Sequence, residues 1–272
     1  MQSDIILSVL GADGAIKATQ KGAGGASLLY HAPYAPGDVL RVEGPAHLWL
    51  QLDHAVGGAQ VYLPGGRFDY PVPDEAIRCI YPPGAFAGDR HLLCARALLP
   101  QEAQAFRNLA YNPYDSNGND GLFPHVRANV ETRGEAQFFA RNAIDGILEN
   151  HGHGPWPYTS WGIGERDDAV MTLYFGREVC LSVMALILRA DFPHDNHWIS
   201  ARFTFADGSA HAAQLSPSPT DQTQHIPLPH PVRTAWVRLD GLTRNPADPS
   251  PFPALTQWLA FGDASGGGDL LP

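Results

Sequence analysis

The chain has 272 residues and a formal net charge of −10, with Asp+Glu 28 against Lys+Arg 18. This acidic balance works against binding to nucleic acid or to an anionic membrane, because both carry negative charge. Gly 28 and Pro 24 together favour many turns over long helices. The length is sufficient for two moderate hydrophobic cores, which we expect in preference to one large core.

The N-terminal residues lack the basic segment of a signal peptide, and no apolar run approaches the ~20 residues that span a bilayer. The cysteines Cys79, Cys94 and Cys180 have no metal-ligand spacing. Cys79 and Cys94 could pair if the fold brought them together, but reduced thiols are expected. We therefore expect a cytoplasmic chain.

The first part of the chain alternates short apolar runs with turn-forming residues. The run from His47 to Leu52 places its leucines on one face, as a half-buried strand requires. Strands are expected at residues 5–10, 27–30, 39–42, 47–52, 60–63, 67–70, 78–81 and 91–97. Regular short strands at this spacing predict an antiparallel β-sandwich over residues 1–111.

The segment from Pro100 to Ala110 is the strongest helix candidate, because proline suits the first turn and apolar residues repeat at helical spacing. Turn-forming residues then predict a polar linker at 112–121 and a second domain over 122–272. Strands are expected there at 171–175, 179–188, 198–205, 210–215, 235–239 and 255–261. No segment between them reads as a crossover helix, which argues against a parallel sheet.

The second domain carries an ordered set of short motifs. They are Asn142-Ala-Ile-Asp-Gly146, Ser160-Trp-Gly162, Thr172-Leu-Tyr-Phe-Gly176, Phe205-Ala-Asp-Gly208 and Ala254-Leu-Thr-Gln-Trp-Leu-Ala-Phe-Gly262. In this order, over about residues 125–263, they resemble discoidin-type domains, the galactose-binding-like jelly rolls of coagulation-factor C-type domains and many sugar-binding modules. The resemblance implies an eight-stranded β-sandwich whose loops at one end bind a ligand, often a sugar. Residues 1–110 show no such resemblance, and their sandwich is expected from the strand pattern alone. The expected fold of the whole chain is all-β, with two β-sandwich domains, the second a galactose-binding-like jelly roll, and a short connecting helix.

Discoidin-type domains often hold a structural calcium ion. The resemblance implies that the Asp145 carboxylate and nearby loop carbonyls would supply oxygen ligands. Family members often place a Glu in the last strand to complete this site, whereas this chain has Gln257, which offers a neutral oxygen but no charge. One structural calcium ion at Asp145 and Gln257 is therefore one expectation, and a turn-capping Asp145 before Gly146 is the other. No organic cofactor is expected.

Sugar recognition needs an apolar platform for the ring and fixed donors and acceptors for the hydroxyls. Trp156 and Tyr158, in a loop rich in Gly and Pro, would supply the platform, whereas Trp161 and Trp198 are expected in the core. The hydrogen-bonding candidates are His125, Asn129, Arg133, His151, His153, Arg189, Asp191 and Asp195. We therefore expect carbohydrate binding through loops at one end of the second domain.

Other interpretations of the same residues stay open. A glycoside hydrolase would pair Glu131 with Asp191 or Asp195, and a polysaccharide lyase would use His194 or Tyr158 as a base beside Arg133 or Arg189. The pairs His151/His153 and His194/His197 could bind a transition metal together with Asp191 or Asp195. Arg189 and Asp191, two apart on an extended chain, would face the same side and form a salt bridge. The first domain could instead serve protein–protein assembly, with an oligomer as the product.

Overall fold

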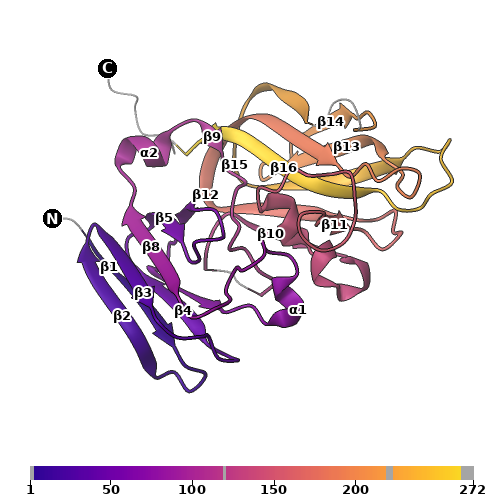
Figure 1. The fold of residues 1–272 in the computed structure, drawn as a ribbon. Coiled ribbons are helices and arrows are strands. Elements are labelled where there is room, and N and C mark those ends of the chain that lie inside the picture. The colour runs from indigo at the N-terminus through magenta and orange to yellow at the C-terminus, as the bar shows by residue number, and fades with distance from the viewer. Residues whose placement is uncertain (1–2, 119–120, 219–222, 265–272) are drawn as a thin grey trace.

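The computed structural model describes residues 3–118, 121–218 and 223–264. These residues fold into two β-sandwiches that lie side by side, each around its own hydrophobic core (Figure 1). The all-β fold class predicted from the sequence is confirmed. No helix within the described ranges is long and apolar enough to cross a membrane.

The first sandwich consists of two four-stranded antiparallel sheets. Side chains alternate across each strand, so every second residue points into the core. Ile5 and Leu7 of one sheet and Leu48 and Leu50 of the other are fully buried in this way. In spatial order, one sheet comprises β2 (Ile16–Ala23), β1 (Asp4–Leu10), β4 (Val39–Glu43) and β7 (Arg67–Pro71), and the other β3 (Gly25–Tyr30), β8 (His91–Ala97), β5 (His47–Gln51) and β6 (Ala59–Tyr62).

Two segments of the first sandwich differ from the prediction. β2 (Ile16–Ala23) was not expected, and most of its side chains are exposed, so it lacks the apolar alternation that marks a strand. Residues 78–81 were expected as a strand. Instead, Arg78 is the last residue of the short helix α1 (Glu75–Arg78), and residues 79–81 follow this helix. The Asp74 carboxylate caps this helix by accepting a hydrogen bond from the Ile77 amide at 2.9 Å.

The second sandwich is one continuous antiparallel ladder. The first part of β12 pairs with β10, and its second part pairs with β16. Its register with β15 shifts between Tyr174 and Val179, around Gly176, which has a φ of +70°. The long strands β12 and β15 thus connect the layers of this sandwich. In spatial order the ladder comprises β11 (Trp161–Gly162), β16 (Ala254–Asp263), β12 (Met171–Leu188), β15 (Gln224–Arg244), β13 (Trp198–Phe205) and β14 (Ala210–Gln214), with β10 (His125–Ala128) on β12.

The connection between the sandwiches is closely packed. Helix α2 (Pro100–Gln104) is shorter than predicted, because the chain then extends into β9 (Arg107–Asn108), which pairs with β16. In the segment 112–121, expected as a linker, Asn112, Tyr114 and Asp115 are buried. Short 3-10 turns follow at Thr132–Gly134, Ala136–Phe138 and Ala140–Ile144.

All three cysteines are free.

Candidate functional site

Segments that are far apart in the sequence line one hollow of about 470 Å³ in the second sandwich. This volume lies in the range of pockets for small-molecule ligands. The hollow brings together several of the predicted site residues with side chains that the sequence did not single out as ligands. The predicted residues are Glu131, Arg133, His153, Arg189 and His194, and the others include Phe138 and Glu165. Phe252, in the proline-rich loop before the last strand, also lines the hollow.

Three rings stack in a column beside this hollow. Phe252 lies parallel to His194, with centroids 5.0 Å apart and an interplanar angle of 5°. His194 in turn lies on His153 at 4.3 Å and 11°. Because Phe252 and His153 cover both faces of His194, this imidazole can present only its edge to a ligand. Of the two phenylalanines that line the hollow, Phe252 is 38% exposed and Phe138 only 6%, so Phe252 is the one that a ligand can contact.

Buried hydrogen bonds fasten the loop that carries Phe252. The Asn196 amide, itself buried, donates to three backbone carbonyls of the 245–250 loop at 2.9–3.2 Å. The Ser250 hydroxyl donates to the His194 carbonyl at 2.5 Å, and the Phe252 amide donates to that hydroxyl at 3.3 Å. The position of Phe252 against His194 is therefore fixed by the fold before any ligand binds.

A buried ion pair lies beneath the ring column. The Asp195 carboxylate, fully buried, accepts hydrogen bonds from the Arg189 guanidinium at 2.5–3.0 Å and from the Asp191 amide at 2.8 Å. The predicted salt bridge between Arg189 and Asp191 is wrong, because the chain turns here and the Asp195 amide donates to the Asp191 carbonyl. This turn places Asp195, rather than Asp191, against the guanidinium.

Two other charged groups of the hollow, Glu131 and Arg133, are engaged by neighbouring groups, whereas Glu165 is exposed. The Glu131 oxygens accept from the Ala140 amide at 2.7 Å and from the Asn117 side chain at 2.8 Å. Arg133 forms two hydrogen bonds with Glu135, at 2.6 and 2.9 Å. Both guanidinium groups that line the hollow are therefore paired with carboxylates, so the hollow does not offer an uncompensated positive charge to a ligand.

The remaining predicted ligand residues lie outside this hollow: His125, Asn129, His151, Trp156 and Tyr158. His125 is buried, with Nδ1 2.6 Å from Asp115, and Asn129 binds backbone groups of residues 168 and 170. His151 is exposed and lies 3.1 Å from Glu149.

Neither of the two predicted platform residues lines the hollow. Trp156 is half-buried, and its backbone amide donates to the Cys79 carbonyl of the first sandwich. Tyr158 is 41% exposed and its ring lies over Gly152. Trp161 and Trp198 are fully buried in the core, as expected.

The oxygens around Asp145 converge on the Gln257 amide nitrogen. This nitrogen donates to the carbonyls of Asn142 and Thr256 and to the Asp145 carboxylate, at 2.6–2.9 Å. The Arg141 guanidinium lies 3.8 Å from the second Asp145 oxygen. Calcium requires 6–8 oxygens at 2.3–2.6 Å. Residues arranged in this way do not fit a calcium ion, because an amide nitrogen and a guanidinium already face the carboxylate.

Burial raises the pKa of Asp145 to about 6, although Arg141, the Ile147 amide and Gln257 all favour its charged form. The pKa of an unfolded Asp is ~3.9, so this carboxyl stabilises the fold most below that pH, and the contribution is lost as the pH rises through about 6. In Asp145→Asn, which keeps the acceptor oxygen, we expect the fall in unfolding free energy between pH 4 and pH 7 to shrink by about 2–3 kcal/mol. Urea unfolding of both proteins across this range measures the difference, and parallel profiles would contradict it.

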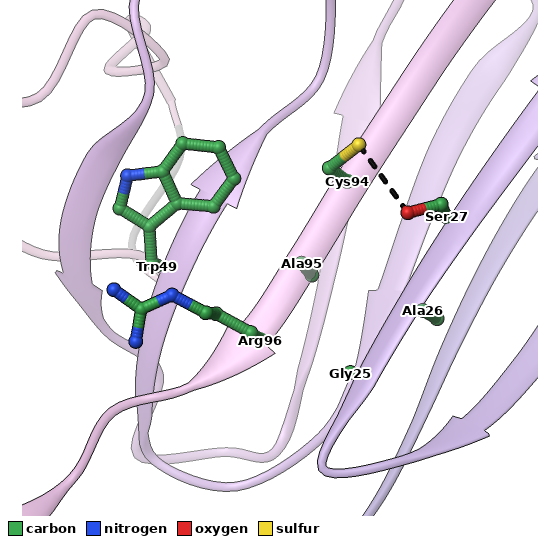
Figure 2. Close-up of a pocket in the computed structure, with 7 residues that line it drawn as sticks. All are labelled: Gly25, Ala26, Ser27, Trp49, Cys94, Ala95 and Arg96. Atoms are coloured by element: carbon green, nitrogen blue, oxygen red, sulfur yellow. Dashed lines mark hydrogen bonds between the residues drawn. The ribbon is translucent and has the colours of Figure 1, made fainter.

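A second hollow, of about 550 Å³, lies on the outer face of the first sandwich (Figure 2). Trp49 of β5 and Arg96 of β8 stand on one side of it, beside the small residues of β3. Gly58 leaves room for the indole, since a Cβ there would lie 2.2 Å from the Trp49 ring. Arg96 is held by two hydrogen bonds of 2.8 Å to Glu102. This hollow offers one aromatic side chain and one guanidinium already paired with a carboxylate.

Neither protein-family models nor curated protein sequences match the chain. Solved structures of similar fold include chitosan-binding module 1 of a chitosanase/glucanase from Paenibacillus sp. IK-5 (16% identity, 57% of this chain, 99% of that chain, TM-score 0.37). A fucose-binding module of Streptococcus pneumoniae matches at 14% identity (57% and 96% of the chains, TM-score 0.41). The family 32 module of C. perfringens NanJ, in complex with galactose, matches at 14% identity (50% and 91%, TM-score 0.37). These neighbours are carbohydrate-binding modules, with low identity in every case.

Proposed function

We propose that the chain binds a neutral saccharide in the hollow lined by Phe252, His194, His153 and Arg189. The observation that carries this proposal is the preformed ring column, held beside hydrogen-bonding groups by buried contacts. The proposal includes the assignment of the second sandwich to the discoidin-type jelly rolls, which the ordered sequence motifs support.

The chemistry of the hollow suits a sugar. A sugar ring presents C–H groups to an aromatic side chain and hydroxyls to donors and acceptors. Phe252 supplies the aromatic surface, and the imidazole edges supply nitrogen donors or acceptors. Rigid placement of these groups reduces the conformational entropy lost on binding. Because Arg133 and Arg189 are each paired with a carboxylate, we favour a neutral sugar over a uronate.

The same geometry favours binding over hydrolysis. A glycoside hydrolase needs two carboxyl groups, one to protonate the leaving group and one to attack or to activate water. Both oxygens of Glu131 accept hydrogen bonds from the fold, and both oxygens of Asp195 accept from Arg189. Asp191 lies 2.5 Å from His153 Nδ1. These three carboxylates are thus held by neighbouring donors. The exposed Glu165, which also lines the hollow, would be a single carboxylate where hydrolysis needs two.

We expect Phe252→Ala to weaken saccharide binding by about tenfold or more, since truncated aromatic side chains in binding sites often contribute over 1 kcal/mol. Titration calorimetry with galactose, fucose and a uronate measures the affinity, and a reducing-end assay on oligosaccharides should show no product. Trp49→Ala is the matched control, because it removes an aromatic side chain from the hollow of the first sandwich. If Trp49→Ala weakens binding and Phe252→Ala does not, the site lies on the first sandwich instead.

A further inference from the structure

Three side chains with metal-binding atoms converge at the end of the ring column. His153, Asp191 and His194 each offer one ligand atom, and these atoms lie within 4.8 Å of one another. The His153 and Asp191 side chains already approach to 2.5 Å. The two histidines are about 40% exposed, so an ion could reach them from solvent.

The surroundings of His194 match those of a metal-binding histidine. Such a histidine usually donates its second ring N–H to a carboxylate, which fixes the tautomer and the ring orientation. His194 Nδ1 lies 3.0 Å from Asp195 Oδ1. Arg189 and the Asp191 amide in turn hold Asp195 in place. This arrangement leaves Nε2 of His194 as the atom able to bind an ion.

Packing restricts both imidazoles. Phe252 covers one face of His194, and His153 covers the other at an interplanar angle of 11°. Phe252 is itself fixed through Ser250. The two rings are therefore held face to face, with their edges close together, and they bind one ion together once they tilt so that both ring planes point at it.

We propose that His153, Asp191 and His194 form a binding site for a divalent transition-metal ion of the zinc class. Two imidazoles and one carboxylate suit zinc, cobalt or nickel, whereas calcium and magnesium prefer sites made of oxygen ligands. Three protein ligands leave coordination positions open, as in sites where a zinc ion also binds water or another small molecule. Asp195 acts as a positioning residue, because it orients His194 and is itself buried.

The test uses zinc alone, so it does not depend on saccharide binding. After treatment with a chelator and its removal, the full chain is titrated with Zn²⁺ by calorimetry, and Co²⁺ is followed by its visible absorption. We expect one saturable site for Zn²⁺ and no comparable binding of Mg²⁺. Each of His153→Ala, Asp191→Ala and His194→Ala should weaken this site by about tenfold or more.

His151→Ala is the matched control, because His151 is an exposed histidine of the same loop that contacts Glu149. Its affinity for Zn²⁺ should equal that of the unmodified chain. The double variant of His153 and His194 should retain its fold by circular dichroism, because both side chains are exposed. The proposal is overturned if no saturable Zn²⁺ binding is found, or if this double variant binds Zn²⁺ as tightly as His151→Ala.

Discussion

Asp195→Ala should lower the free energy of unfolding by about 3–5 kcal/mol, because it leaves the Arg189 guanidinium buried without its counter-ion. Asp195 is fully buried, and the side chain of Arg189 is 5% exposed. Without the carboxylate, the bond from Arg189 to the Ser160 hydroxyl, at 3.4 Å, is a poor replacement. Equilibrium unfolding in urea measures the loss.

Asp168→Ala is the matched control for this substitution. Asp168 also forms an Arg–Asp pair, with Arg166, but both side chains are exposed. Exposed pairs of this kind contribute far less, because solvent and salt screen the two charges. Replacing both buried partners, in Arg189→Met with Asp195→Ala, should restore part of the lost stability, because neither buried charge remains. An equal fall in the free energy of unfolding for Asp195→Ala and Asp168→Ala would show that burial of the Arg189–Asp195 pair does not contribute to stability.

Strands with a clear apolar alternation were predictable from the sequence. Trp198–Phe205 was predicted with the bounds that β13 has, and its inward residues include Phe203 and Phe205. The unpredicted strand β2 exposes most of its side chains, so hydrogen bonding to β1, rather than burial, determines its conformation. Helix α1 was missed because four residues contain too little periodicity, although its Asp74 cap is visible in the sequence.

The candidate site was predictable as a set of loops but not as a set of contacts. The sequence indicated the polar segment around His194, whereas the contact between His194 and Phe252 depends on how two loops meet in the fold. The assignment of Asp191 as the partner of Arg189 assumed an extended chain. The turn that ends at Asp195 is determined by side-chain bonds to Arg189 and to the Asp191 amide, which periodicity does not reveal.

Gln257→Glu should make the stability of the chain dependent on calcium. In the unmodified chain the Gln257 nitrogen binds three oxygens, from Asn142, Asp145 and Thr256. A carboxylate oxygen in its place would face those same oxygens at about the same separation. Two buried carboxylates and two carbonyls without donors should cost about 3–5 kcal/mol in a chelator, in the range for an uncompensated buried charge.

Calcium should recover much of this loss because the variant converts a hydrogen-bonded cluster into an oxygen-lined one. A hard cation between the Asp145 and Glu carboxylates would satisfy the oxygens that repel one another. At a calcium concentration of about 100 times Kd, the gain is about 2.7 kcal/mol. Thermal unfolding with chelator and with millimolar calcium measures both steps.

Gln257→Met separates loss of the amide from gain of the charge. Methionine has a similar size and removes the same three hydrogen bonds, together with the one that the Gly146 amide donates to the Gln257 oxygen. It offers calcium no oxygen, so its stability should not respond to the ion. The unmodified chain should not respond either, because an amide nitrogen lies where the ion would have to bind. A calcium-dependent rise in the unfolding temperature of the unmodified chain, equal to that of Gln257→Glu, would mean that the ion binds beside Gln257 and that Asp145 is a calcium ligand after all.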